Sequence, residues 1–158
     1  MTEDETRFGK RAHVLGVICF QWSYLEYLIA NAVWYAMGTG KRQGMIVTGS
    51  MNLNGLMALA IDLLSEREDC EPIIDELRRL RRALGGEEGL QFRRNLLVHG
   101  VYSSREGDAT VMIELHRKQR LREKTPVTLQ YFEETLRMLS NEIDSLVPIW
   151  QQAGINVD

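Results

Sequence analysis

The chain has 158 residues, 44% of them hydrophobic, and a formal net charge of −3 at pH 7. This length suits one domain, residues 1–158, with a sizeable buried core. The charge excludes a global positive field that would attract nucleic acid or acidic membranes. The start of the chain is acidic rather than basic, and its longest early apolar run, residues 14–20, is too short to span a bilayer. We therefore expect a cytoplasmic protein that does not contact membranes.

Apolar residues recur at helical spacing along the first part of the chain. They predict a long amphipathic helix from about Thr6 to Met37, which Gly38-Thr39-Gly40 ends. Residues 41–51 are ambiguous, and a short turn of helix is one possibility. A second helix is predicted from Leu53 to Glu66, with Asn52 as its candidate N-cap.

The next helical pattern begins at Pro72, which suits a first helical position. Its basic stretch, residues 78–82, is expected to be a solvated face with intrahelical ion pairs such as Asp75 with Arg79. The segment Gly85-Gly86-Glu87-Glu88-Gly89 then interrupts the pattern, either as a break or strained turn or as a kink in one continuous helix.

A further helix, or the continuation of the third, carries Leu90 through His99. Gly100 fits the left-handed residue that commonly follows a helix end. The pattern then alternates, and residues 101–104 and 110–116 are predicted strands of a β-hairpin around residues 105–109.

The end of the chain is helical again. Thr125-Pro126 marks a loop, and Thr128 is a good cap for a last helix, whose final turn Pro148 could kink. The predicted fold is therefore mainly α: a four- to five-helix up-and-down bundle with a small β-hairpin inserted before the last helix. Because such a bundle often buries remaining apolar surface against a copy of itself, we expect a homodimer.

The segment FRRNLLVHG, residues 92–100, gathers polar and charged side chains at a predicted helix end. Asn95 and His99 lie four residues apart on one helical face, where Asn95 could hydrogen-bond one imidazole nitrogen and aim the other outward. Arg94 lies about 140° round the axis from His99. One chain does not obviously clamp a phosphate between them, but two chains related by a twofold axis could do so in a shared cleft.

This set of groups matches the chemistry of RNA cleavage. RNA carries its own nucleophile, the 2′-OH. A neutral imidazole could accept its proton, an imidazolium could protonate the leaving 5′-oxygen, and a guanidinium could stabilise charge on the phosphate. The products would be a 2′,3′-cyclic phosphate and a 5′-OH, with no metal or cofactor required. The sequence has no evident metal-ligand cluster, since Cys19 and Cys70 lack close-spaced partners.

The motif Arg94-Asn95-x-x-x-His99, followed by Gly100, resembles the signature of the HEPN superfamily (higher eukaryotes and prokaryotes nucleotide-binding domains). The segment QWSYLEYLIANAV and the final helix are similar to members of that superfamily as well. The resemblance implies a single HEPN-like helical domain. It also implies a dimeric, metal-independent endoribonuclease with a composite site, as in toxin–antitoxin, phage-defence and RNA-processing systems.

The resemblance also implies roles for individual residues. Arg94 would hold the phosphate of an RNA substrate, Asn95 would position the motif, and His99 would transfer protons. Arg93 is a second candidate for phosphate contact, with a solvated arginine as the alternative. Tyr102 is a further candidate for contact with RNA.

Three considerations leave alternatives open. Superfamily toxins that pair with small nucleotidyltransferases carry a tyrosine two residues after the histidine, whereas Val101 stands there in this chain and Tyr102 comes one later. The resemblance therefore does not extend to inactivation through that tyrosine, and an antitoxin or other protein partner stays one open alternative. Since other members have lost catalysis, the alternative function is an inactive HEPN-like module that binds RNA, a nucleotide or a protein. Arginine and histidine near the C-terminal end of a helix also interact favourably with the helix dipole, which requires no catalytic role.

Overall fold

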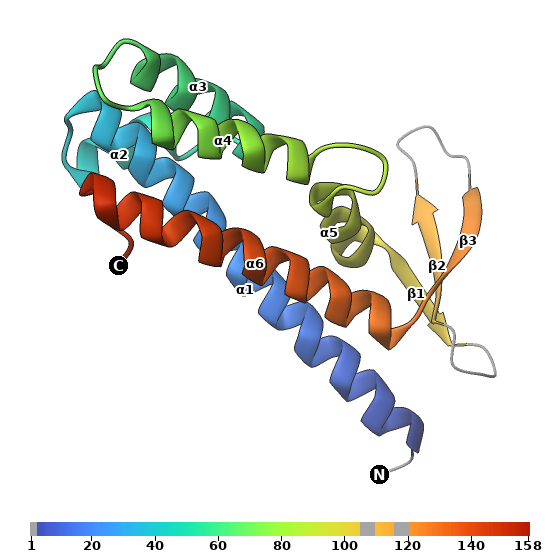
Figure 1. Cartoon of the computed structure of the whole chain (residues 1–158). Coiled ribbons are helices and arrows are strands. Elements are labelled where there is room, and N and C mark those ends of the chain that lie inside the picture. The colour runs from blue at the N-terminus through green and yellow to red at the C-terminus, as the bar shows by residue number, and fades with distance from the viewer. Residues whose placement is uncertain (1–2, 105–109, 116–120) are drawn as a thin grey trace. The chain divides into compact units, whose positions relative to one another are not determined.

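The computed structural model describes the backbone of residues 3–104, 110–115 and 121–158, and the side chains of residues 9–100 and 127–158. The described residues form six helices and three strands (Figure 1), which are α1 Glu3–Met37, α2 Lys41–Thr48, α3 Leu53–Ser65, α4 Glu71–Leu84, α5 Leu90–His99, β1 Val101–Ser104, β2 Thr110–Leu115, β3 Leu121–Val127 and α6 Leu129–Ala153. The prediction of a mainly helical protein is confirmed. The described part has more helices than the four or five expected, because residues 41–48 form a helix of their own.

The chain divides into two compact units. Unit 1 comprises Met1–Phe20 and Gly85–Leu139, and unit 2 comprises Gln21–Leu84 and Ser140–Asp158. Helices α1 and α6 each contribute residues to both units. The expectation of a single domain stays a prediction.

Unit 2 has an apolar core to which four helices contribute. Helices α3 and α4 pack against each other and run side by side in Figure 1. Trp150 of α6 is fully buried, and its indole Nε1 donates a hydrogen bond of 2.8 Å to the carbonyl of Leu28 in α1. Because its one polar atom is satisfied, the large ring can be buried without a desolvation penalty. Other fully buried side chains of this core are Leu25, Ile29, Met57, Leu64, Leu77, Leu80 and Leu84.

Helix α2 is short and owes its position to Trp34 of α1. The Trp34 indole donates to Thr48 Oγ1 at 3.0 Å, and the Thr48 hydroxyl donates to the carbonyl of Gly44 at 2.9 Å. Gly44 is needed for this close approach, since a Cβ at its position would overlap the indole ring. An eight-residue helix is marginal by itself, so contact with Trp34 explains why α2 forms.

The predicted helix caps are confirmed. Asn52 Oδ1 accepts a hydrogen bond of 2.9 Å from the backbone N–H of Gly55 at the start of α3. Thr128 Oγ1 accepts one of 3.2 Å from the N–H of Tyr131 at the start of α6. Helix α1 ends at Met37, and the next residue, Gly38, has a φ of +64°, the left-handed conformation that glycine adopts readily. Helix α6 continues through Pro148 to Ala153.

The glycine-rich segment between α4 and α5 breaks the helix, as one of the two interpretations expected. Gly86 has a φ of +92°, which a helix cannot continue. The prediction for Gly100 is wrong: its φ of −71° and ψ of 150° are extended rather than left-handed. The physical reason is that the chain passes from α5 directly into β1, so it needs extended backbone at this point.

Unit 1 contains an antiparallel sheet in the order β1-β2-β3. Val101 lies opposite Ile113, and the pairing of β2 with β3 shifts register between Met112 and Glu114. The expectation of a loop at residues 125–126 is wrong, because both belong to β3 and Pro126 lies opposite Val111. A proline is tolerated there because β3 is an edge strand. Some N–H positions of an edge strand face solvent and form no hydrogen bond within the sheet. Residues 105–109 and His116 lie outside the described residues, so the hairpin stays a prediction.

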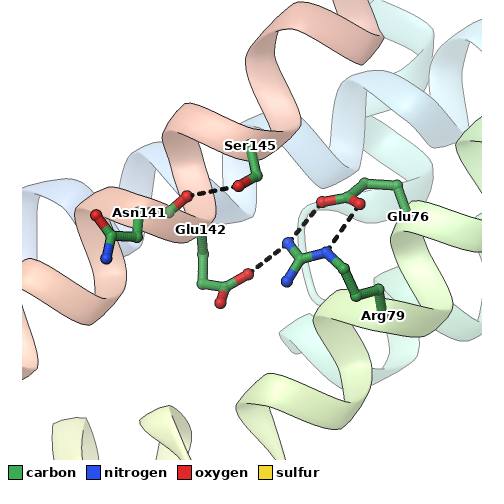
Figure 2. A network of polar contacts seen from close by, with 5 residues as sticks. All are labelled: Glu76, Arg79, Asn141, Glu142 and Ser145. Carbon is green, nitrogen blue, oxygen red and sulfur yellow. Dashed lines mark hydrogen bonds and ion pairs between the residues drawn. The ribbon is translucent and has the colours of Figure 1, made fainter.

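A charged network links α4 and α6 within unit 2 (Figure 2). Arg79 Nε and Nη2 donate to the two carboxylate oxygens of Glu76 at 2.9 and 2.6 Å, and Nη2 also donates to Glu142 at 2.6 Å. These hydrogen bonds raise the pKa of Arg79 further above its ordinary range. The expected pairing of Asp75 with Arg79 is wrong: Asp75 lies 3.7 Å from Arg78 instead.

Candidate helix-end site on α5

Helix α5 has one buried face and one exposed face. Leu90 and Leu97 are 1% and 0% exposed, and at helical spacing they lie within about 20° of each other round the axis. The opposite face carries Phe92, Asn95 and His99, all three of which are exposed. Asn95 and His99 therefore share one exposed face, as their spacing predicts.

Arg94 reaches this face through a contact with its neighbour. Its Cα lies on the far side of the helix from His99, and its side chain is half-buried. The guanidinium nevertheless extends round the helix, so that Nη1 donates a hydrogen bond of 3.0 Å to Asn95 Oδ1. The acceptor must be the amide oxygen, because a guanidinium has only donors. The charged end of Arg94 thus lies at Asn95, one helical turn before His99.

This arrangement differs from the expected role of Asn95. The sequence suggested that the Asn95 amide would hydrogen-bond the imidazole and fix its tautomer. The described side chains contain no hydrogen bond between Asn95 and His99, and the amide oxygen of Asn95 accepts from Arg94. Asn95 therefore orients the arginine of the motif. His99 is exposed at the last residue of α5, where a ligand in solvent can reach its ring.

Arg93 packs against the start of α6, within unit 1. Its guanidinium carbon lies 4.5 Å from the centre of the Tyr131 ring, and Nη1 lies 3.8 Å from Glu134 Oε2. The Arg93 side chain is only 18% exposed. Burial raises the pKa of Tyr131, the Arg93 charge opposes that rise, and Glu88 adds to it. These contacts favour a role for Arg93 in holding α5 against α6, and its predicted contact with RNA stays a prediction.

The remaining candidates are less fully described. The Tyr102 side chain lies outside the described side chains, and its backbone lies opposite Met112 in the sheet. Phe92 lies on the same face as Asn95 and His99, and its helical spacing of three and seven residues from them is the sequence signal for that position. Its ring is 41% exposed. The groups that the structure brings together on α5 are therefore Arg94, Asn95, His99 and Phe92.

Fold and site together define a mainly helical protein in which Asn95 and His99 share an exposed helix face and a half-buried Arg94 donates a hydrogen bond to Asn95. Comparison with known proteins finds no matching family model, no matching curated protein and no matching solved structure. Among the residues that the structure describes, no three histidine, cysteine, aspartate or glutamate side chains are grouped as metal ligands. No helix in the described part of the chain combines the length and apolar character needed to cross a membrane.

Proposed function

We propose that this protein is a metal-independent endoribonuclease of HEPN type that acts as a homodimer. The observation that supports the proposal is the hydrogen bond from Arg94 to Asn95, since Asn95 lies on the exposed face of α5 that also holds His99. The same proposal includes a HEPN-like fold with a β-hairpin before α6 and a cytoplasmic location. It also includes a toxin or defence role with an antitoxin or other protein partner.

The mechanism follows from the ionisable groups of the site. A neutral His99 imidazole accepts the proton of the RNA 2′-OH, and the 2′-oxygen attacks phosphorus. The bond from phosphorus to the 5′-oxygen breaks, and an imidazolium gives its proton to the leaving oxygen. The Arg94 guanidinium stabilises the charge that develops on the non-bridging oxygens. The products are a 2′,3′-cyclic phosphate and a 5′-OH.

This mechanism explains why the proposal includes a dimer. One imidazole cannot be the base and the acid in the same step, because it would have to be neutral and protonated at once. A second copy of His99, brought to the site by a twofold axis, supplies the other protonation state. The exposure of His99 is compatible with such an arrangement.

The test is RNA cleavage by the full-length protein in EDTA, with analysis of the product ends. We expect His99→Ala to lower the rate by about 10²–10⁴-fold and Arg94→Ala by about 10²–10³-fold. His13→Ala and Arg82→Ala are matched controls at exposed helical positions and should leave the rate unchanged. Cleavage that persists in both site variants would eliminate this site. Cleavage that disappears in EDTA would contradict the metal-free mechanism, and sedimentation of a monomer would contradict the dimer.

A second candidate function is a non-catalytic module that binds RNA, a nucleotide or a protein through the same helix face. The net charge of −3 and the half-buried position of Arg94 favour it. This function predicts oligonucleotide binding that weakens with salt, no turnover, and loss of binding in Arg94→Ala. Product formation by the purified wild-type protein, abolished in His99→Ala, would decide for the enzyme.

A further inference from the structure

Helix α2 exposes the kind of side chain that a surface helix normally buries. Met45, Ile46 and Val47 are 54%, 79% and 44% exposed, and they are three of the five large apolar side chains exposed in the described part of the chain. The buried residues of α2 are Gly44 and Thr48 instead. A surface helix ordinarily turns its apolar side chains toward the core and its polar side chains toward solvent. The polarity of α2 is therefore reversed.

Contacts with Trp34 hold α2 in this orientation. Ile46 lies two residues from both Gly44 and Thr48, about 160° round the helix axis from each of them. Thr48 accepts a hydrogen bond from the Trp34 indole, and Gly44 lies so close to the ring that a Cβ at its position would overlap it. The face with glycine and threonine is thus fixed against Trp34, and Ile46 is left in solvent. A run of three exposed apolar residues is unfavourable in water and is generally explained by binding.

The charges on α2 are positive. Lys41 and Arg42 begin the helix, and residues 27–61 contain no aspartate or glutamate, although the whole chain has 22 acidic residues. Arg42 is exposed one turn before Ile46, about 40° round the axis. The Lys41 ammonium lies 5.2 Å from the centre of the Tyr27 ring, within the same unit. Cations in a first turn oppose the helix dipole, so α2 departs from two local preferences at once.

We propose that the outward face of α2 is the docking surface for an acidic amphipathic helix of a partner protein. This docking face consists of Arg42, Met45, Ile46 and Val47. The apolar stripe of the partner helix packs on Ile46, at the separation of about 8–10 Å between axes that is typical of packed helices. Its flanking carboxylates contact Arg42 and Lys41, which makes the two surfaces complementary in charge. The inference goes beyond the proposed function, which assigns no role to α2.

Other occupants suit the docking face less well. A second copy related by a twofold axis would place α2 against α2 and bring two Arg42 side chains together. A nucleic acid would place phosphates against aliphatic side chains. A membrane would receive three apolar side chains and two cations from a chain with a net charge of −3, which is less than stable anchoring requires. An acidic amphipathic helix satisfies both the apolar and the cationic side chains.

Fluorescence anisotropy with the full-length protein tests the proposal. The probe is a labelled synthetic peptide that carries leucines along one helical face and glutamates on both sides of that face. One control peptide has lysine in place of every glutamate, and a second has serine in place of every leucine. The acidic leucine peptide should bind, and each control peptide should bind at least about 10-fold more weakly.

Variants of the protein locate the binding surface. Ile46→Ser should raise the Kd of the acidic leucine peptide by about 10-fold or more, because an apolar contact is lost. Phe20→Ser is the matched control, since Phe20 is 77% exposed and lies outside the docking face. Arg42→Glu should raise Kd by about 5-fold, whereas Arg82→Glu makes the same change in net charge elsewhere and should leave Kd unchanged. All four side chains are exposed, so the variants should keep the circular dichroism spectrum of the wild type.

Several results would overturn the proposal. These are failure of the acidic leucine peptide to bind, equal binding of the lysine peptide, and equal binding by Ile46→Ser and the wild type. Conversion of a dimer to a monomer by Ile46→Ser would show that a second copy occupies the docking face. Cosedimentation with vesicles of phosphatidylcholine and phosphatidylglycerol, lost in Ile46→Ser and without peptide binding, would show a membrane there. None of these measurements depends on RNA cleavage, so the docking surface and the proposed nuclease can fail separately.

Discussion

Replacing Gly44 with alanine should destabilise the protein, although the same change inside a helix normally stabilises it by about 1 kcal/mol. The reason is the contact between α2 and Trp34. A Cβ at position 44 would overlap three atoms of the indole ring, Cγ, Cδ1 and Nε1. Trp34 is 7% exposed and donates to Thr48, so the ring cannot move aside without losing that hydrogen bond.

The expected magnitude combines three terms. Overpacking of a buried site costs about 1–3 kcal/mol, and loss of the hydrogen bond from Trp34 to Thr48 costs about 1 kcal/mol more. The better helix propensity of alanine offsets about 1 kcal/mol of this. Gly44→Ala should therefore lower the free energy of unfolding by about 1–3 kcal/mol.

Urea unfolding followed by circular dichroism measures this difference, and Gly16→Ala is the matched control. Gly16 lies within α1, and nothing lies within 4 Å of a Cβ built on it. This control should raise the free energy of unfolding by up to about 1 kcal/mol. If Gly44→Ala stabilises the protein as much as Gly16→Ala does, Trp34 does not lie against α2 and the reasoning is refuted.

Two further predictions concern charge and pH. Glu142→Gln should lower the free energy of unfolding by about 1 kcal/mol, a modest value because Arg79 is 39% exposed and keeps its two bonds to Glu76. Asp75→Asn, which removes the exposed pair with Arg78, should cost less than about 0.5 kcal/mol in the same urea titration; equal costs would contradict the network of Figure 2. The pKa of Tyr131 is raised, so the folded state holds the phenolic proton more tightly than the unfolded chain does. The resulting stabilisation of the folded state is complete below the ordinary pKa of 10.0 and is lost as pH rises through the pKa of the folded state. Tyr131→Phe should therefore lose less stability than the wild type between pH 9 and pH 11, roughly the range in which tyrosine ionises, and identical pH profiles would show that Tyr131 is not half-buried beside Arg93.

Local chemistry was sufficient to predict several features of the fold. The caps at Asn52 and Thr128 depend on side-chain oxygens and backbone N–H groups only three residues away. The break at residues 85–89 was only one of two open interpretations, and the structure decides between them through the positive φ of Gly86. Features that depend on distant residues were not predictable in this way. Helix α2 needs Trp34, and the extended backbone around Pro126 needs β2 as its neighbour.

The same distinction applies to the candidate site. Spacing alone placed Asn95 and His99 on one face, and that prediction is confirmed by their exposure. The partner of Asn95 was not predictable, because its amide oxygen can accept from an imidazole one turn later or from a guanidinium next to it. The choice depends on the rotamer of Arg94, whose side chain is half-buried. Helical spacing cannot supply that information.

The chemical nature of residue 95 determines how much charge the helix end presents. An amide carbonyl is a neutral acceptor, so the Asn95 contact orients the Arg94 guanidinium without placing a negative charge next to it. An aspartate at this position would hold the guanidinium in the same place, but its negative charge would cancel the attraction for any anion. Asparagine at position 95 thus orients the cation without itself adding a negative charge to an already acidic protein.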